Sequence, residues 1–311
     1  MGSWVSYALG RLSDNLPAFV VIPDSRGLPY NSKGSFGSGF LPVVHQATLL
    51  RPTAPEPVAD LFPPKSERIT KESEGEGLAL LHRLNRDHLA DRPGDSRLEG
   101  RIASYEMAAR MQLSAPEALD LAKESDETRK MYGLDRKETA DFGTNCLTAR
   151  RLLERGVRFV QLWSGTAGAT GNWDNHADIA KELTFIATSV DQPIAALLKD
   201  LKQRGMLEDT LVVWTTEFGR MPFAQGSVGR DHNGGVFTSW LAGAGVKAGA
   251  SYGESDEWAW KAQKDAVMGY DFHATILHLM GIDHEKLVFR HNGADRRLTD
   301  VHGHVIKDIL A

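Results

Sequence analysis

Two short segments in the second half of the chain carry residues that could bind a metal ion. Asp174 and His176 are separated by one residue, so both side chains can reach one point. Asp231 and His232 are adjacent in a second segment, and Glu217 directly follows an apolar run. Carboxylates and imidazoles suit Zn²⁺, Mn²⁺ and related divalent ions. The metal ligands predicted from the sequence are therefore Asp174, His176, Glu217, Asp231 and His232, and the predicted ion is Zn, Mn or Ca.

Two arginines lie close to these residues in the sequence. Arg220 comes three positions after Glu217, and Arg230 directly precedes Asp231. A guanidinium group can hold an oxyanion through two parallel hydrogen bonds. Arg220 and Arg230 are therefore the predicted catalytic residues, as contacts to a negatively charged substrate.

Simpler roles remain open for the same side chains. Asp174 could cap the helix that follows it, because aspartate is a common N-cap residue, and His176 would then be a solvated neighbour. Glu217 could form an ion pair with Arg220 or Arg230. Each residue alone is a weak signal, and their combination on three neighbouring loops favours a binding site.

The elements predicted around these residues form a strand–helix–strand unit. Residues 157–163 and 210–216 are apolar runs rich in β-branched and aromatic side chains, which is typical of strands. Residues 176–204 repeat apolar side chains every three or four positions, which predicts a helix that ends at Gly205. Such a unit implies a parallel strand pair with a right-handed crossover. The candidate residues then follow the carboxyl ends of the strands, where sites are built in open α/β sheets.

The same signals predict the rest of the fold. Further predicted elements are strands at 16–22 and 236–244, an extended segment at 51–65, charged helices at 66–132 with a capping box from Ser114 to Glu117, a helix at 141–155 ended by Gly156, a loop at 229–235, and a helix at 271–281 capped by Asp271 and Gly281. Together they predict an α/β fold with a mostly parallel sheet and helices on both faces. We expect one domain over residues 1–311, with a helical insertion at about 66–140.

Composition excludes several classes of function. The formal net charge of −5 over 311 residues gives no basic face for nucleic acid. No stretch approaches the roughly 20 apolar residues that span a bilayer. The single cysteine, Cys146, excludes an internal disulfide and a cysteine-based zinc cluster.

Six motifs occur in an order that points to a known family. They are residues 1–7, 142–162, 173–176, 217–220, 229–232 and 274–283. In this order they resemble the domain-of-unknown-function family fifteen-oh-one, sulfatase-like proteins of planctomycetes and related bacteria. That family is related to the alkaline phosphatase superfamily, whose members use one or two divalent metals to hydrolyse or transfer phosphate or sulfate esters. The resemblance implies an alkaline-phosphatase-like fold, a periplasmic or exported protein, and a small anionic ester or sulfated glycan as substrate.

The resemblance also implies individual roles. Asp174 and His176 resemble the Asp/His pair on the first metal of the superfamily, and His232 resembles its late histidine. Glu217 stands where the superfamily has an Asp-His pair for a second metal, and Phe218 replaces that histidine.

Two departures from the pattern shape the expectation: Phe218 in place of histidine weakens the second metal site, and the chain begins after the N-terminal region of the family. Family members are usually longer, with an export leader and an N-terminal strand that supplies a metal-binding acid. In the superfamily the nucleophile also comes from that part, so we expect this chain to lack an N-terminal portion. Residues 146–150 approximate the sulfatase Cys-x-Pro-x-Arg motif, but Thr148 replaces the proline, and we expect Cys146 to be a small buried residue.

The predicted function is a metal-dependent hydrolase of phosphate or sulfate esters. The alternative is a non-catalytic relative that binds an anionic glycan or a protein partner in the same cleft. A third possibility is a structural piece of a larger exported assembly.

Overall fold

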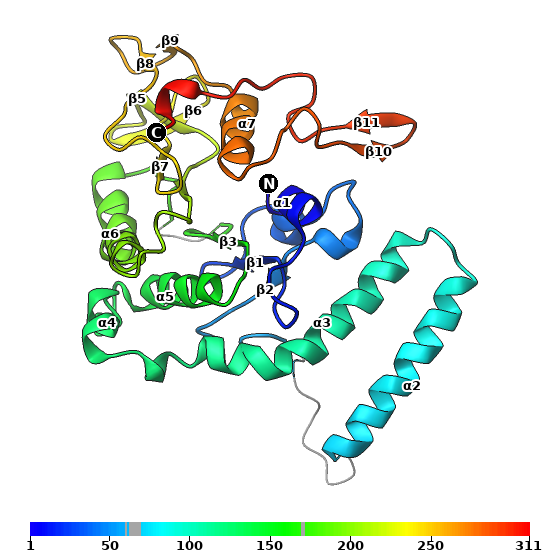
Figure 1. Ribbon diagram of the computed structural model, residues 1–311. Coiled ribbons are helices and arrows are strands. Elements are labelled where there is room, and N and C mark those ends of the chain that lie inside the picture. Colours follow the sequence, from blue (N-terminus) through cyan, green and yellow to red (C-terminus); the bar gives the residue numbers. More distant parts are fainter. Residues whose placement is uncertain (60, 62–69, 169–171) are drawn as a thin grey trace.

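A three-stranded parallel sheet lies at the centre of the fold (Figure 1). The computed structural model describes residues 1–59, 61, 70–168 and 172–311. Strand β1 (Phe19–Ile22) runs between β2 (Thr48–Leu49) and β3 (Phe159–Leu162). All four side chains of β1 are buried, which confirms the apolar strand predicted at 16–22.

Helices cover both faces of this sheet because alternate side chains of β1 enter different cores. Val20 and Ile22 pack with Leu152 of α5 (Ala140–Glu154). Phe19 points to the other face, where a Cβ atom on Gly2 of α1 (Gly2–Leu9) would lie 2.6 Å from its ring. The predicted covering of both faces is therefore confirmed for this small sheet.

The second strand of the predicted strand–helix–strand unit does not join this sheet. Strand β4 (Val212–Trp214) pairs antiparallel with β7 (Trp240–Ala242), and the rings of Trp214 and Trp240 stack 6.4 Å apart. In the described residues no ladder joins β4 to β3, so the predicted parallel pair is wrong. An apolar run can predict a strand, but its own sequence does not specify which other strand it pairs with. Here the partner of β4 is β7.

The other strands form three small antiparallel ladders. They are β5 (Gly219–Gln225) with β6 (Gly229–Asn233), β8 (Glu254–Ser255) with β9 (Ala262–Lys264), and β10 (Phe289–His291) with β11 (Ala294–Arg296). The α/β class is confirmed, whereas a large and mostly parallel sheet is wrong. The loop predicted at 229–235 is also wrong, because most of it is strand β6.

Three predicted helices are observed with small shifts. They are α5, α6 (Ile179–Gln203) and α7 (Gly269–Leu279). Gly156, Gly205 and Gly281 follow them with φ angles of 85°, 68° and 75°, as expected for glycines that end helices. Asp271 is not the N-cap of α7. It lies in the first turn, and its carboxylate accepts a hydrogen bond from the Met268 backbone N–H at 2.9 Å.

The charged region contains α2 (Lys71–Ala90), α3 (Ser96–Leu119) and α4 (Asp126–Met131). Residues 62–69, where the predicted insertion begins, lie outside the described part. The capping box predicted at Ser114 is wrong, because α3 begins after its N-cap Asp95 and continues through Pro116. The apolar side chains of Met111, Ala115 and Ala118 lie on one buried side of α3, and this packing keeps the helix continuous. Figure 1 shows α2 beside α3 at the outer edge of the molecule.

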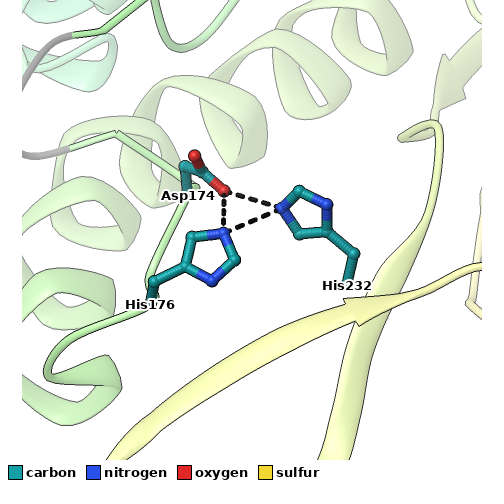
Figure 2. Close-up of side chains that lie close together, drawn as sticks. All are labelled: Asp174, His176 and His232. Carbon is teal, nitrogen blue, oxygen red and sulfur yellow. Dashed lines mark hydrogen bonds and ion pairs between the residues drawn. The ribbon is translucent and has the colours of Figure 1, made fainter. Parts of the chain in front are cut away.

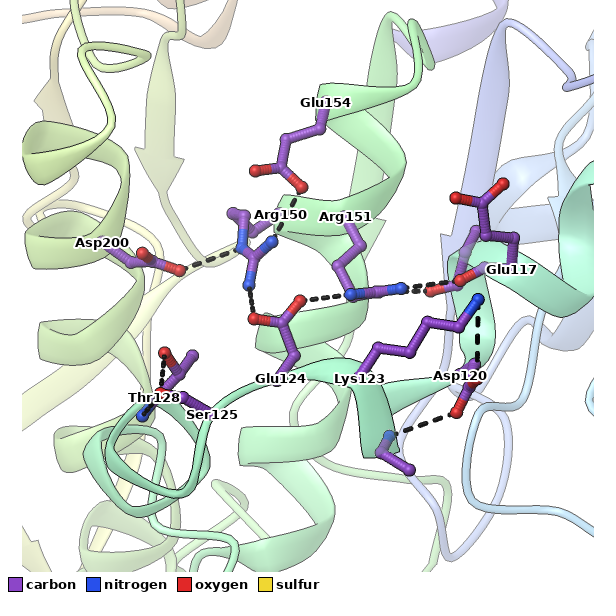
Figure 3. A network of polar contacts seen from close by, with 12 residues as sticks. Glu117, Asp120, Lys123, Glu124, Ser125, Thr128, Arg150, Arg151, Glu154 and Asp200 are labelled. Carbon is purple, nitrogen blue, oxygen red and sulfur yellow. Dashed lines mark hydrogen bonds and ion pairs between the residues drawn. The ribbon is translucent and has the colours of Figure 1, made fainter.

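A buried ionic network joins α5 to α6 (Figure 3). The Arg150 side chain is only 1% exposed and donates to Glu124 at 2.6 Å, Glu154 at 2.7 Å and Asp200 at 2.9 Å. Cys146 is fully buried one turn earlier on α5, and burial raises the pKa of its thiol far above the ordinary value. The expected packing role of Cys146 is confirmed, and Arg150 of the same motif is structural as well.

Short 3-10 helices complete the described secondary structure. They are η1 (Ser32–Phe36), η2 (Val43–His45), η3 (Leu121–Lys123) and η4 (Lys307–Ile309). In the part of the chain that the structure describes, no helix combines the length and apolar character needed to cross a bilayer, as predicted.

Candidate metal centre

Asp174, His176 and His232 converge on one point at the surface (Figure 2). The Oδ1 atom of Asp174 lies 2.8 Å from Nε2 of His176 and 2.9 Å from Nε2 of His232. The two Nε2 atoms are 3.0 Å apart. Asp174 and His176 come from the loop between β3 and α6, and His232 comes from β6, so the fold joins residues that lie far apart in the sequence.

The loop that presents Asp174 is fixed by two buried asparagines. The Asn172 side chain accepts from the Asp174 backbone N–H at 2.7 Å and donates to the Thr166 carbonyl at 2.9 Å. The Asn175 side chain donates to the Asn172 carbonyl at 3.2 Å. Such side-chain bonds to the backbone replace the secondary structure that this segment lacks. They hold Asp174 in position without a helix or strand.

The same loop packs directly against strand β6. The backbone N–H of Arg230 donates to the Asn175 carbonyl at 3.1 Å. A Cβ atom on Gly229 would lie 1.7 Å from the His176 carbonyl oxygen, so only glycine allows this approach. Strand β6 therefore brings His232 beside the loop.

Two neighbours orient the imidazole rings. His176 Nδ1 is hydrogen-bonded to Oε1 of Gln225. Because an amide oxygen only accepts, Nδ1 donates this hydrogen bond, which turns Nε2 toward Asp174 and His232. The Phe218 ring stacks on His232 with 4.0 Å between centroids. Phe218 thus packs against a candidate ligand.

Arg220 links the loop that carries Asp174 to strand β6. Its guanidinium group donates to the Trp173 carbonyl at 2.6 Å, to the Arg230 carbonyl at 3.2 Å and to Oδ1 of Asp174 at 3.0 Å. Partial burial acts to raise the pKa of Asp174, but the hydrogen bonds from His232 and Arg220 outweigh it and lower the pKa to about 2. Asp174 is therefore an anion at any physiological pH.

The three remaining predicted residues lie outside this cluster. Glu217 is exposed, and its carboxylate accepts from the Thr216 hydroxyl at 3.2 Å. Asp231 accepts from the backbone N–H of His232 at 2.7 Å and lines a shallow surface depression with Trp260. Arg230 donates to the carbonyl of Gly229 at 2.8 Å.

The simpler roles considered for the candidate residues are not observed. Helix α6 is capped by Asp178, whose carboxylate accepts from the Lys181 backbone N–H at 3.2 Å, so Asp174 is not the cap. Within the described ranges, Glu217 forms no ion pair with Arg220 or Arg230.

The geometry of the triad fits a divalent ion. Ligand atoms bound about 2.05 Å from a tetrahedral ion lie about 3.3 Å apart. The three ligand separations here are 2.8, 2.9 and 3.0 Å, so binding an ion requires only a small outward movement. The side chains are 35%, 35% and 42% exposed, which leaves one side open to solvent. Three protein ligands and an open position are typical of catalytic metal sites.

The structure also shows supporting residues that the sequence did not suggest. These are Asn172, Asn175 and Gln225. The asparagines flank Trp173 and Asp174 in an Asn-rich loop, which is a weak signal for side-chain bonds to the backbone. Gln225 offers no signal, because its contact with His176 depends on the pairing of β5 with β6.

The fold and the triad define a mixed α/β protein with a candidate metal centre. The chain belongs to the family of proteins of unknown function DUF1501, which matches residues 1–310. This match confirms the family indicated by the six motifs, while the relation to sulfatases stays a prediction. No curated protein and no solved structure matches the chain.

Proposed function

We propose that the protein is a metal-dependent hydrolase of phosphate or sulfate esters. The observation that carries this proposal is the convergence of Asp174, His176 and His232 within 3.0 Å of one another at an accessible surface. A divalent ion held by these side chains would polarise an ester oxygen and lower the pKa of a bound water molecule.

The ligand set argues for one ion of the zinc or manganese type. Two imidazole nitrogens and one carboxylate match the ligands of zinc hydrolases. Calcium takes six to eight oxygen ligands, so two histidines make it a poor match. Glu217 and Asp231 lie outside the triad, so we propose a single site rather than two.

The charges of the site favour an anionic substrate. One carboxylate leaves a bound divalent ion with a net positive charge, and the Arg220 guanidinium lies 3.0 Å from Asp174. Open exposure of both histidines allows a bulky ester to approach. Electrostatic stabilisation of developing negative charge is the main requirement for hydrolysis of such esters.

Arg220 is better described as a positioning residue than as a contact to substrate. Its hydrogen bonds go to two backbone carbonyls and to Asp174. These bonds hold the carboxylate against the two histidines. Gln225 has the corresponding role for His176, because it directs the Nε2 lone pair toward the ion.

A second candidate function is binding of an anion without hydrolysis. In the described part of the chain, no serine or threonine hydroxyl is hydrogen-bonded to the triad, and the thiol of Cys146 is buried elsewhere. Hydrolysis would therefore use water as its nucleophile. If water is not activated, the same centre would retain an anionic glycan or an acidic partner.

Hydrolysis assays with metal removal separate these functions. We expect the protein to cleave p-nitrophenyl phosphate or p-nitrophenyl sulfate, to lose this activity in chelator and to regain it with Zn²⁺ or Mn²⁺. Asp174→Asn and His232→Ala should be inactive, whereas Asp231→Asn, one position away on the opposite side of β6, should retain activity. Metal-dependent binding of sulfate or phosphate without turnover would select the binding function. Hydrolysis that survives both chelator and Asp174→Asn would refute the proposal.

A further inference from the structure

The surface depression beside Asp231 has two aromatic rings in its walls. Its volume is about 250 Å³. Its lining residues are Met221, Phe223, Ala224, Gln225, Asp231 and Trp260. The rings of Phe223 and Trp260 meet edge to face, with 5.6 Å between their centroids and 82° between their planes. Both side chains are nearly half exposed, at 49% and 42%. The depression is therefore a corner between two perpendicular rings that is open to solvent.

The turn that carries Trp260 is held in place by the rest of the chain. The Asp256 carboxylate accepts from the backbone N–H groups of Trp260 at 2.8 Å and Lys261 at 3.2 Å. A Cβ atom on Gly235 would lie 2.7 Å from the Trp260 carbonyl oxygen, so the turn packs closely on the segment that follows β6. Phe223 belongs to β5, which is paired with β6. The corner thus exists before a ligand arrives, and such preorganisation favours binding.

The charge inside the depression favours a cation. Asp231 is exposed, and in the described part of the chain it forms no ion pair. One of its carboxylate oxygens accepts from the backbone N–H of His232, which leaves the other oxygen for a ligand. The faces of aromatic rings carry negative charge density and attract cations as well. Carboxylate and rings therefore act in the same direction.

Two cations lie near the depression but outside its lining. Lys261 Nζ is 5.1 Å from the centroid of the Trp260 ring, and the Asp256 carboxylate beside it offsets its charge. Arg230 precedes Asp231 in β6, and adjacent residues of a strand point to opposite faces. Its guanidinium group donates to the Gly229 carbonyl at 2.8 Å. Asp231 is thus the charged group of the lining itself.

The lining offers few hydrogen-bonding partners, which selects among cations. Oε1 of Gln225 is already bonded to His176 Nδ1, so Asp231 is the remaining acceptor side chain of the lining. A primary ammonium group has three N–H donors to satisfy, and a sugar ring has several hydroxyl groups. A quaternary ammonium group has no N–H, and aromatic rings recognise it without hydrogen bonds.

We propose that this depression binds the quaternary ammonium group of a small molecule of the choline type. The methyl groups pack in the corner between Phe223 and Trp260, and Asp231 balances the positive charge. A volume below the roughly 300 Å³ of pockets for drug-sized ligands suits such a head group. Because the rings and the carboxylate are partly exposed, we expect a dissociation constant on the order of 1 mM.

Saturation-transfer difference NMR titrations of the full chain test the proposal. Choline should bind, whereas 3,3-dimethyl-1-butanol, a neutral molecule of the same shape, should bind about 10-fold more weakly or less. Trp260→Ala should weaken choline binding by about 10-fold and Asp231→Asn by about 3-fold or more. Trp258→Ala is the matched control, because this side chain is 64% exposed in the same turn but outside the lining. Absence of choline binding, equal binding of the neutral molecule, or equal loss in Trp258→Ala and Trp260→Ala would overturn the proposal.

Two further arms separate the source of the ligand and the role of the metal centre. Asp174→Asn should bind choline like the wild type, so failure of the proposed metal site and failure of this site give different results. The protein should not sediment with phosphatidylcholine vesicles, because we propose a small molecule and not a membrane surface. Sedimentation that Trp260→Ala abolishes, or tighter binding of methyl β-glucopyranoside than of choline, would contradict the assignment.

Discussion

Replacement of Arg150 by methionine should destabilise the protein by about 3 to 5 kcal/mol. The change removes a buried cation from three carboxylates, of which Glu124 and Asp200 have side chains that are 8% and 5% exposed. Removal of one member of a buried ionic network costs about this much, because the remaining charges stay buried and unpaired. Asp200 keeps hydrogen bonds from Arg204 at 2.7 Å and Tyr132 at 3.0 Å, which favours the lower end of the range.

The assay is urea unfolding at neutral pH, with the thermal midpoint as a second readout. For a chain of this length, we expect a loss of about 5 to 8 °C. Arg155→Met is the matched control, because Arg155 also belongs to the end of α5 but contacts Glu117 at 3.4 Å and is 25% exposed. An exposed pair of this kind contributes less than about 1 kcal/mol. Equal losses in both variants would refute the reasoning.

The ionic network around Arg150 should also make the free energy of unfolding depend on pH. Burial acts to raise the pKa of Glu124, but hydrogen bonds from Arg150 and Arg151 outweigh it and lower the pKa below the ordinary 4.5. A lowered carboxyl pKa gives stability that is present above the ordinary pKa and is lost as pH falls through the folded value. Unfolding measured from pH 6 to pH 3 should therefore show a smaller acid dependence in Arg150→Met than in the wild type.

Three further predictions concern the triad and α7. Gly229→Ala should lower the free energy of unfolding by more than about 1 kcal/mol and weaken metal binding, because the added Cβ would meet the His176 carbonyl. Gly234→Ala should leave the free energy of unfolding unchanged in the same urea assay, because nothing lies within 4 Å of its Cβ. Gln225→Ala should weaken the affinity for Zn²⁺ by about 10- to 100-fold in a competition titration, and an unchanged affinity would exclude its role in orienting His176. Burial lowers the pKa of His273 to about 4, so the unfolded chain takes up a proton near pH 6.5 and the folded chain does not. The free energy of unfolding should therefore decrease as the pH falls from 6.5 to 4, by at most about 3 kcal/mol. Solvent screening makes the decrease smaller, because the ring is partly exposed. His273→Leu should lose this part of the pH dependence.

The local elements could be predicted because their signals are local. The apolar run at 19–22 and the three-and-four spacing of α6 each depend on neighbouring residues alone. The partner of β4 could not be predicted, because an apolar strand can form hydrogen bonds with any free strand edge. Its actual partner, β7, lies elsewhere in the chain. Strand β6 gave no signal, because Gly229–Asn233 is polar throughout and lacks alternation.

The site could be predicted in part for the same reason. Asp174 and His176 are close in sequence, and their spacing was sufficient to pair them. Asp231 lies outside the triad because adjacent residues of a strand point to opposite faces, so that only His232 approaches Asp174 and His176. The roles of Gln225 and Asn175 depend on contacts that exist only in the folded chain.

Metal content is the most direct test of the central claim that Asp174, His176 and His232 form one metal site. The protein should be purified without chelator and analysed by inductively coupled plasma mass spectrometry beside Asp174→Asn and Asp231→Asn. We predict about one equivalent of Zn or Mn per chain in the wild type and in Asp231→Asn, and none above background in Asp174→Asn. A wild-type protein without metal, or an Asp174→Asn protein that retains it, would contradict the account.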